Sequence, residues 1–477
     1  MMDRFPAVID GKDVETAGSF VSEDPSTGEP LAEVARGGAG EIDAAVRAAR
    51  TASEGAWPAT ATAERGRILR TIAELIRRDR TELALLESRD TGKPLKQART
   101  DVDVAARYFE FYGGTIDAFY GDTIPLSPEL TAYTFHEPFG VTAHIVPWNY
   151  PIQISARTVA PALATGNCCV LKPAEEAPLT AIRLAKLSLE AGLPPGALNV
   201  VPGFGEEAGA PLAAHPGVDH VSFTGSVDVG RLVQRAAADN VVPVALELGG
   251  KSPNIVFADA DLDAAVPVIV NSILQNAGQT CSAGSRVLVD EVTHADLISA
   301  IADRFAQVKI GPGPEDPDLG PLISRQQLER VRDFVESARD GARLVSGGTT
   351  PDGLGGGYFF EPTLFDGVAP DAPIAREEVF GPVLAVTPFR DAEEAARLAN
   401  ATDYGLVTAV WTADVTTAHR LARAVRAGQV YVNTYGAGGG VELPFGGYKR
   451  SGFGREKGFE ALRTYSQVKT VTIRLPG

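Results

Sequence analysis

Cys281 lies in the segment of the chain best suited to covalent chemistry. It is one of three cysteines in 477 residues, and the other two, Cys168 and Cys169, are adjacent in an apolar run. Residues 274–285 are polar and small, with a glycine on each side of the cysteine, so the backbone can bend tightly and a ligand can approach. A nucleophilic thiol needs such access and nearby backbone N–H groups. A lone cysteine is more often a small buried hydrophobe, so its role depends on the rest of the chain.

A carboxylate suited to general-base chemistry precedes the cysteine. Glu247 stands between Leu246 and Leu248 at the end of an apolar stretch, and paired glycines follow. Apolar surroundings raise the pKa of a carboxyl group and make it a usable base near neutral pH. A glutamate on a strand edge facing water is an equally good interpretation of this pattern taken alone.

An amide donor is presented by a proline-bounded loop. Asn149 lies in residues 147–151 (Pro-Trp-Asn-Tyr-Pro), whose two prolines hold the loop in a fixed, extended path. A rigidly held amide suits an oxyanion hole. A purely structural loop is the more common explanation of such a segment.

Two motifs suit a phosphate-bearing cofactor. Residues 223–226 (Phe-Thr-Gly-Ser) join an apolar strand to a helix expected over 227–238, and a glycine turn at a helix N-terminus binds pyrophosphate. The spacing is not GxGxxG, so an ordinary turn is an equal alternative. Lys172 ends another apolar strand and Glu175 follows three residues later. The pair could hold a ribose by hydrogen bonds or form a solvated ion pair, and the ion pair is favoured when the motif stands alone.

The elements that must position these residues alternate between strand and helix. Residues 141–248 predict a doubly wound parallel sheet, which binds ligands at the C-terminal ends of its strands. A second alternating series covers 251–432 and predicts a second α/β domain. Cys281 and Glu247 then lie near the boundary between the two domains, a usual place for an active site. Before them, 40–120 is helical, with a long amphipathic run over 63–90.

Composition narrows the class of protein. The net charge of −17 argues against nucleic acid or an anionic membrane as the main partner. Three cysteines are not a disulfide framework and fit a reducing compartment. No signal peptide and no long apolar run is recognised, so we expect a soluble, cytoplasmic protein without a membrane segment. Residues 465–475 alternate like a strand with nothing local to pair with, which predicts pairing with another subunit.

Together the motifs resemble the NAD(P)-dependent aldehyde dehydrogenase superfamily, in its non-acylating, hydrolytic type. The matching segments, in order, are 147–151, 172–175, 223–226, 246–253, 276–281, 377–382 and 444–449. The resemblance implies an α/β fold with a Rossmann-like cofactor domain, a second α/β catalytic domain and a small β oligomerisation extension. The implied boundaries are 1–121 and 139–247 for the NAD-binding domain, 248–443 for the catalytic domain, and 122–138 with 463–477 for the extension. A homodimer or homotetramer is expected.

The resemblance also implies a mechanism. Cys281 attacks an aldehyde, while the Asn149 amide and the Cys281 backbone N–H stabilise the oxyanion of the thiohemiacetal. Hydride transfer to the nicotinamide leaves a thioester, and Glu247 activates the water that hydrolyses it to a carboxylic acid. Relatives that pass the acyl group to coenzyme A lack this glutamate, so its presence favours hydrolysis. Lys172 completes the catalytic set. Since a free cysteine has a pKa of about 8.5, a local device must raise the thiolate fraction.

Family precedent assigns the cofactor contacts. Lys172 and Glu175 are expected on the adenosine ribose, Glu378 on the nicotinamide ribose and Phe380 beside the nicotinamide. A carboxylate at Glu175 accepts from a ribose 2′-hydroxyl and repels a 2′-phosphate, so NAD is preferred over NADP. No metal is expected. The full expected set is Ile145, Val146, Pro147, Trp148, Lys172, Glu175, Gly205, Phe223, Gly225, Ser226, Val229, Leu248, Glu378 and Phe380.

Tyr150, Arg157 and Phe445 are expected to line the aldehyde pocket, so the substrate class is inferred from them. Arg157 follows Asn149 by eight residues, where many simple aldehyde enzymes carry tryptophan. Succinate-semialdehyde enzymes share this arginine but add a second one at the position of Gln275, and a guanidinium can pair with a carboxylate. A structural arginine is slightly favoured over a substrate clamp.

The glycine-dense loop 435–443 is expected to admit a larger or aromatic aldehyde. A broad, aromatic or aliphatic aldehyde is therefore the preferred substrate class, with an anionic semialdehyde as the alternative. Two other classes of function remain open: a structural or binding protein that keeps the fold without turnover, and acyl-transfer or esterase chemistry at Cys281.

Overall fold

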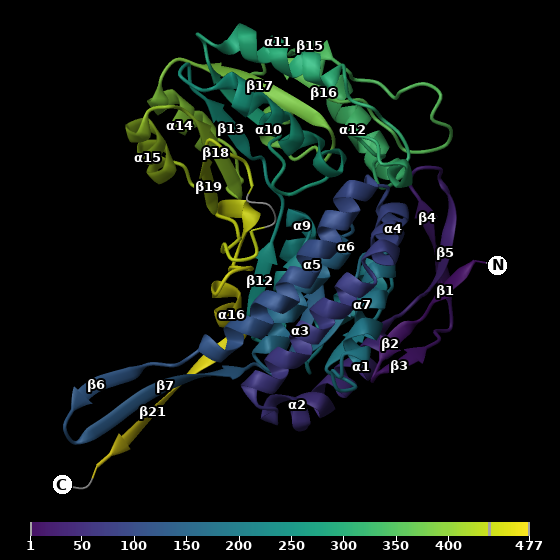
Figure 1. Cartoon of the computed structure of the whole chain (residues 1–477), viewed down its shortest axis with the longest axis vertical. Coiled ribbons are helices and arrows are strands. Elements are labelled where there is room, and N and C mark those ends of the chain that lie inside the picture. Colours follow the sequence, from purple (N-terminus) through teal and green to yellow (C-terminus); the bar gives the residue numbers. More distant parts are fainter. Residues whose placement is uncertain (1, 437–439, 476–477) are drawn as a thin grey trace.

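The computed structural model describes residues 2–436 and 440–475. Two large sheets, each flanked by helices, form the body of the molecule, and a three-stranded arm extends away from it (Figure 1). Part of the glycine-dense loop expected at 435–443 falls on residues 437–439, outside the described part of the chain.

The first sheet is the doubly wound parallel sheet that the sequence predicts. Its strand order is β20-β12-β11-β8-β9-β10-β2-β3, and the five central strands are parallel to one another. Those five are almost wholly buried, as expected for apolar strands covered on both faces. The strands are β20 (Gly452–Phe453), β12 (Val244–Glu247), β11 (His220–Thr224), β8 (Val141–Ile145), β9 (Cys168–Lys172), β10 (Leu198–Val200), β2 (Ala7–Ile9) and β3 (Lys12–Val14).

Two groups of helices pack around this sheet. Helices α6 and α7 contact α3, α4 and α5, whereas α1 and α9 both contact α8. Their bounds are α1 (Ala39–Ser53), α2 (Ala56–Ala59), α3 (Thr62–Arg78), α4 (Arg80–Thr91), α5 (Leu95–Thr115), α6 (Pro151–Ala164), α7 (Leu179–Glu190), α8 (Ala210–Ala213) and α9 (Val227–Asp239). A small sheet of β1 (Asp3–Phe5), β5 (Glu29–Ala35) and β4 (Ser19–Asp24) lies beside them near the N-terminus.

The single long helical run expected over 63–90 is wrong in one respect. The structure divides it into α3 and α4 at Asp79, whose backbone (φ −93, ψ 13) leaves the α-helical path. Helix α4 ends where the sequence indicates, at Gly92, which takes the left-handed conformation (φ 76). The apolar periodicity runs through the break because α3 and α4 both contact α7.

The second sheet, seven-stranded, carries the rest of the body. Its order is β15-β16-β17-β14-β13-β18-β19, and only the pairing of β15 with β16 is antiparallel. The strands are β15 (Arg343–Ser346), β16 (Thr363–Asp366), β17 (Val383–Phe389), β14 (Arg286–Asp290), β13 (Pro253–Val256), β18 (Val407–Trp411) and β19 (Gln429–Val432). The helices of this half are α10 (Leu262–Leu274), α11 (His294–Phe305), α12 (Arg325–Ala338), α13 (Pro373–Arg376), α14 (Ala392–Asn400) and α15 (Val415–Ala424).

The arm is a sheet of order β21-β7-β6 that projects from the lower end of the body in Figure 1. Strand β21 (Ser466–Arg474), which follows α16 (Glu460–Thr464), pairs along its full length with β7 (Leu130–Pro138), and β7 also pairs with β6 (Thr123–Ser127). The C-terminal strand, which has no local partner in the sequence, pairs with β7, more than 300 residues earlier in the same chain. The described helices include none long and apolar enough to cross a membrane.

Candidate active site

Cys281 is presented by a backbone segment of unusual conformation. Helix α10 ends at Leu274, and Asn276, Ala277 and Gly278 then take positive φ values of 50, 53 and 73. Two of these are not glycine, and such residues persist in this region only when neighbouring contacts hold them. Here the Gln279 side chain donates to the Asn276 carbonyl (3.1 Å) and accepts from a main-chain N–H (2.9 Å). The loop therefore reaches Cys281 in one fixed path.

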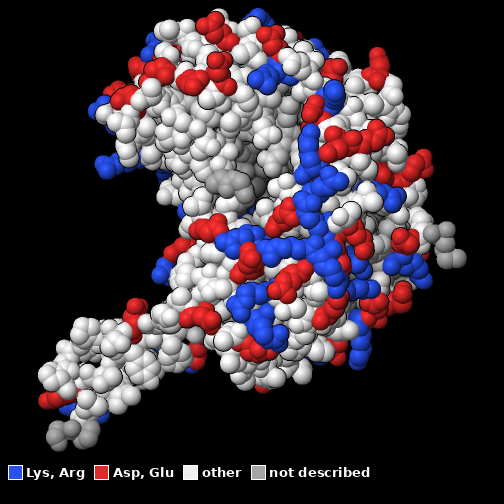
Figure 2. Space-filling model, viewed as in Figure 1, with Lys and Arg blue, Asp and Glu red and all other residues white. Residues whose placement is uncertain are grey.

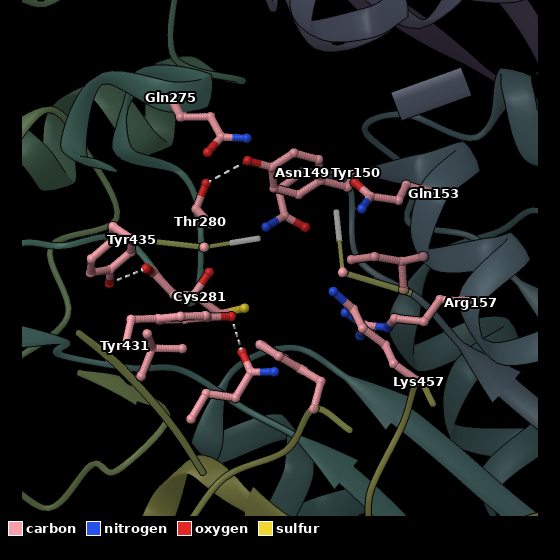
Figure 3. A pocket seen from close by; sticks show the side chains of 17 residues that line it. Asn149, Tyr150, Gln153, Arg157, Gln275, Thr280, Cys281, Tyr431, Tyr435 and Lys457 are labelled. Atoms are coloured by element: carbon pink, nitrogen blue, oxygen red, sulfur yellow. Dashed lines mark hydrogen bonds between the residues drawn. The ribbon is translucent and has the colours of Figure 1, made fainter. Parts of the chain in front are cut away.

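Two pockets meet at the thiol. Asn149 and Cys281 belong to the walls of both, and Figure 3 shows both side chains directed into the first of them. The wall of the first, which we call the inner pocket, comprises Asn149, Tyr150, Gln153, Ile154, Arg157, Gln275, Thr280, Cys281, Ser282, Val407, Gln429, Tyr431, Tyr435, Gly436, Gly440, Phe445 and Lys457. The wall of the second, the outer pocket, comprises Pro147, Trp148, Asn149, Thr224, Gly225, Ser226, Val227, Asp228, Glu247, Gly249, Cys281, Gln327, Arg330, Glu378, Phe380 and Tyr404. Molecules bound in the two pockets would come together at Cys281.

The Asn149 side chain is held close to Cys281 by a hydrogen bond. Its Nδ2 donates to the main-chain oxygen of Gln279 at 3.0 Å, two residues before Cys281. An amide nitrogen has two hydrogens, so one hydrogen is left for a ligand oxygen at the thiol. The amide is 3% exposed, and its Oδ1 accepts no hydrogen bond from the described residues.

The protonation of Cys281 is governed by burial and by cations. Burial raises the pKa of the thiol to about 12, and Arg157 is the strongest opposing influence, followed by a smaller contribution from Lys457. Both cations line the inner pocket and approach it from the same side in Figure 3. Each cation favours the thiolate over the thiol, but burial remains the larger influence, so these two cations alone do not supply the device that raises the thiolate fraction.

Glu247 ends β12 and lies in the wall of the outer pocket. It is 3% exposed, and neither carboxyl oxygen accepts a hydrogen bond from the described residues. Burial first, and then the charge of Glu456, hold its pKa well above the ordinary value, while Arg157 opposes them. Of the two interpretations of the sequence, the buried carboxyl group is correct, and the solvent-facing strand edge is wrong.

Arg157 lies on α6 with its guanidinium already engaged. Its Nε lies 2.5 Å from Oε2 of Glu456, and its terminal nitrogen donates to Thr224 Oγ1 at 3.2 Å. Its Cζ also lies 5.5 Å from the ring centre of Phe445. The ion pair with Glu456 compensates the charge that Arg157 brings to the inner pocket.

Lys457 is a pocket residue that the sequence analysis missed. It lines the inner pocket, and its Nζ lies 5.0 Å from the ring centre of Phe445. Burial lowers its pKa to about 8. No motif marked it, because only the fold brings the segment after β20 back to the pocket.

The outer pocket has the features of a nucleotide site. Gly225 and Ser226 lie between β11 and α9, and the Ser226 hydroxyl caps the helix by accepting from the Val229 N–H at 3.3 Å. Glu378 accepts from the Gly250 N–H at 2.9 Å, and burial raises its pKa to about 7. In the same wall the rings of Trp148 and Phe380 pack edge to face, with their centres 5.3 Å apart.

A family model described as the aldehyde dehydrogenase family matches residues 13–471. The chain belongs to this family. It is 44% identical over 464 residues to the mitochondrial aldehyde dehydrogenase of Equus caballus, an alignment that covers 96% of this chain and 92% of that protein. The structure of the Bacillus cereus aldehyde dehydrogenase in complex with NAD+ superposes with a TM-score of 0.97 at 42% identity, over 99% of this chain and 97% of that one. An indole-3-acetaldehyde dehydrogenase complexed with NAD+ matches equally well (TM-score 0.97, 42% identity, 100% and 97% covered).

Within this family fold the expected residues divide between the two pockets and the sheet behind them. The inner pocket takes all three expected substrate residues, Tyr150, Arg157 and Phe445. The outer pocket takes Pro147, Trp148, Gly225, Ser226, Glu378 and Phe380. Outside both walls lie Ile145, Val146, Lys172, Glu175, Gly205, Phe223, Val229 and Leu248. Of these, Lys172 at the end of β9 pairs with Glu175 (Nζ to Oε2, 2.8 Å).

Two residues of α12 position the 378–380 segment and were not anticipated. Gln327 Nε2 donates to the Phe380 carbonyl at 2.7 Å, and Arg330 donates to the Glu378 carbonyl, also at 2.7 Å. Phe380 needs such support because its φ is 60. A polar face on an amphipathic helix is the sole sequence signal for them, and it does not distinguish them from solvated side chains.

Proposed function

We propose that this dehydrogenase oxidises an aldehyde to the carboxylic acid with NAD, through a covalent intermediate on Cys281 and hydrolysis assisted by Glu247. One observation carries the proposal: Cys281, the Asn149 amide and the buried Glu247 carboxyl group converge where the two pockets meet. An aldehyde enters from the inner pocket, and the cofactor occupies the outer one.

The first step forms a bond between Cys281 Sγ and the carbonyl carbon. The thiol proton passes to solvent, and the carbonyl oxygen becomes an oxyanion that the Asn149 Nδ2 hydrogen stabilises. NAD, which Gly225, Ser226, Glu378 and Phe380 would hold in the outer pocket, would supply the acceptor for the hydride of this carbon. The oxyanion then re-forms a carbonyl, and the substrate remains attached to Cys281 as a thioester.

The second step is hydrolysis. Ionised Glu247 accepts a proton from water, whose oxygen bonds to the thioester carbon. Asn149 stabilises the second oxyanion, and the carbon–sulfur bond breaks. The sulfur takes the proton from Glu247, so the carboxylic acid leaves with both the thiol and the ionised glutamate restored. The raised pKa of Glu247 supports this role, because a stronger base takes the proton more readily.

NAD is preferred over NADP because of Glu175. Its carboxylate is paired with Lys172 at the end of β9, where it would accept from a ribose 2′-hydroxyl and repel a 2′-phosphate. The NAD+ complexes among the similar structures support the same choice. Glu378 and Phe380 line the outer pocket, which supports the assignment of Glu378 to the nicotinamide ribose and of Phe380 to the nicotinamide that the family resemblance implies.

For the substrate, a broad range of aromatic or aliphatic aldehydes is favoured. Tyrosine, phenylalanine and amide side chains make up much of the inner wall. The pairing of Arg157 with Glu456 supports a structural arginine over a carboxylate clamp. An anionic aldehyde is the second candidate, and Lys457 is the observation that favours it, because it adds a cation to a wall with no carboxylate among its described residues.

A homodimer or homotetramer is proposed from the arm. Its strands expose large apolar side chains, among them Leu126 (57%) and Val468 (62%). Figure 2 shows few charged residues on the arm, whereas many acidic and basic residues lie on the body. Exposed apolar surface of this kind marks a protein interface. A cytoplasmic location and the domain boundaries given above complete the proposal.

The test is NADH formation, followed by absorbance, with NAD or NADP and a panel of succinate semialdehyde, benzaldehyde-type and aliphatic aldehydes. Oxidation across the aromatic and aliphatic members with NAD is expected. No oxidation of any member would favour the structural class of protein, and hydrolysis of p-nitrophenyl esters far faster than aldehyde oxidation would favour an esterase. A bias to the semialdehyde would select the second candidate.

A further inference from the structure

A buried lysine that the mechanism above leaves unused lies directly behind Asn149. Lys93 follows the C-terminal glycine of α4 and is 1% exposed. Its Nζ lies 2.6 Å from Asp101 Oδ2, 2.8 Å from the main-chain oxygen of Asn149 and 3.4 Å from Glu87 Oε1. A charged group buried this deeply costs free energy that a hydrophobic residue would not, so its contacts need an explanation.

The Asn149 carbonyl is the contact that leads to the active site. It accepts from Lys93 Nζ on one side and from Asn276 Nδ2, at 2.9 Å, on the other. Asn276 belongs to the left-handed segment that precedes Cys281. Through the Asn276 amide, one carbonyl oxygen thus ties the loop of the oxyanion donor to the loop of the nucleophile. The charge-assisted hydrogen bond from Lys93 holds the same oxygen in a buried site.

The same cluster holds the residues that follow Asn149. Lys93 Nζ lies 4.4 Å from the ring centre of Tyr150, whose hydroxyl is 2.7 Å from Thr280 Oγ1, beside Cys281. Glu87 Oε2 accepts from the Ile152 N–H at 3.4 Å. Lys93 and its carboxylate partner Glu87 therefore contact residues 149, 150 and 152 together.

We propose that Lys93 is a positioning residue, which fixes the Asn149 amide at the place where the oxyanion forms. The inference rests on the role proposed above for Asn149. Without the ammonium group the loop loses both the hydrogen bond to the 149 carbonyl and the cation over Tyr150. The hydrogen bonds of Asn149 with Gln279 and Asn276 then hold the amide less firmly. Misplacement by about 1 Å can cost on the order of 100-fold in rate.

A double-mutant cycle separates positioning from general stability. Lys93→Met keeps an unbranched side chain of similar length and removes the charge. The rate of the NADH burst, which is the NADH formed in the first turnover before the thioester is hydrolysed, should fall about 10-fold. Complete loss of an oxyanion donor costs about 100-fold or more in rate, so a misplaced donor should cost less. In the Asn149→Ala background the same change should alter the burst by less than about two-fold, because no amide is left to position. The alkylation of Cys281 by iodoacetamide forms no oxyanion. The rate of this alkylation should therefore differ by less than about two-fold between Lys93→Met and wild type.

The matched control is Arg65→Met. Arg65, like Lys93, is a cation that donates to main-chain oxygens, those of Pro58, Thr60 and Ala164, but it is only partly buried and belongs to the wall of neither pocket. Its burst rate should stay at the wild-type value. If Lys93→Met fails to fold, the charge-balanced Lys93→Met/Asp101→Asn variant takes its place in the cycle.

Two results would overturn the inference: an unchanged burst in Lys93→Met, or an equal loss with and without Asn149. An Asn149→Ala variant with a wild-type burst would instead refute the oxyanion role in the proposed function. The two failures are therefore distinguishable in one set of measurements.

Discussion

Nε of Arg157 lies 2.5 Å from Oε2 of Glu456, and the two side chains are 7% and 1% exposed. The pair lies between the inner pocket, whose wall includes Arg157, and Glu247, whose pKa Glu456 helps to raise. The charge that resembles a substrate clamp in the sequence is thus part of the framework behind the proposed base.

Removing Arg157 should damage stability before it alters substrate preference. Arg157→Met leaves Glu456 buried without its partner, which costs about 3–5 kcal/mol of unfolding free energy. Denaturant unfolding measures this, with Arg463→Met as control, because its ion pair with Glu460 is exposed and contributes below about 1 kcal/mol. A stable variant that selectively loses semialdehyde oxidation would make Arg157 a clamp.

Cys281→Ala should abolish aldehyde oxidation, because no covalent intermediate can form. Cys168→Ala is the matched control: Cys168 is fully buried in β9 and should be dispensable for turnover. Steady-state NADH formation measures both variants. Wild-type turnover without Cys281 would refute the covalent mechanism.

Glu247→Gln should keep the first NADH burst and slow the steady rate by about 100-fold or more, the usual contribution of a general base. Stopped-flow absorbance distinguishes the two phases. A steady rate equal to wild type would remove Glu247 from the hydrolytic step.

The stability advantage of Glu247→Gln over the wild-type protein should grow as the pH rises. Burial holds the pKa of folded Glu247 well above its unfolded value, so between the two values the unfolded state releases a proton that the folded state keeps. The contribution of Glu247 to stability is therefore full below the unfolded pKa and is lost as the pH rises toward the folded one. In urea, the free energy of unfolding of Glu247→Gln should exceed that of wild type by about 1–3 kcal/mol at pH 8. The difference should be smaller at pH 5. A difference independent of pH would contradict this.

Catalysis should rise with pH for the same reason. Glu247 acts as a base only after losing its proton, so the hydrolysis-limited steady rate should increase as the pH approaches its raised pKa. The burst should also increase, because burial raises the pKa of Cys281. In Glu247→Gln the burst should retain its pH dependence. A wild-type steady rate that falls between pH 6 and 8 would contradict the assignment.

Glu175→Gln should improve the use of NADP. The amide keeps hydrogen-bonding capacity and removes the negative charge that repels a 2′-phosphate, so kcat/KM for NADP should rise about 10-fold. Comparison of kcat/KM for NAD and NADP measures the change. No gain for NADP would place the discrimination elsewhere in the site.

The sequence by itself determined the class of fold, the family and the motif residues. Strand β9 has its predicted limits of Cys168 and Lys172. A short apolar run is typical of a strand that is buried on both faces, so the sequence alone indicates where this strand begins and ends. Cys281 and Asn149 carry local signals, small neighbours and flanking prolines, that do not depend on distant contacts.

Only the tertiary structure decided what surrounds those residues. It paired Arg157 with Glu456, 299 positions later, brought Lys457 to the inner pocket and set Lys93 behind Asn149. It also gave the C-terminal strand its partner in β7. The position of a charged residue in the sequence does not indicate which residue it will pair with. Whether it is solvated, compensated or directed at a ligand depends on burial and distance, which exist only once the chain is folded.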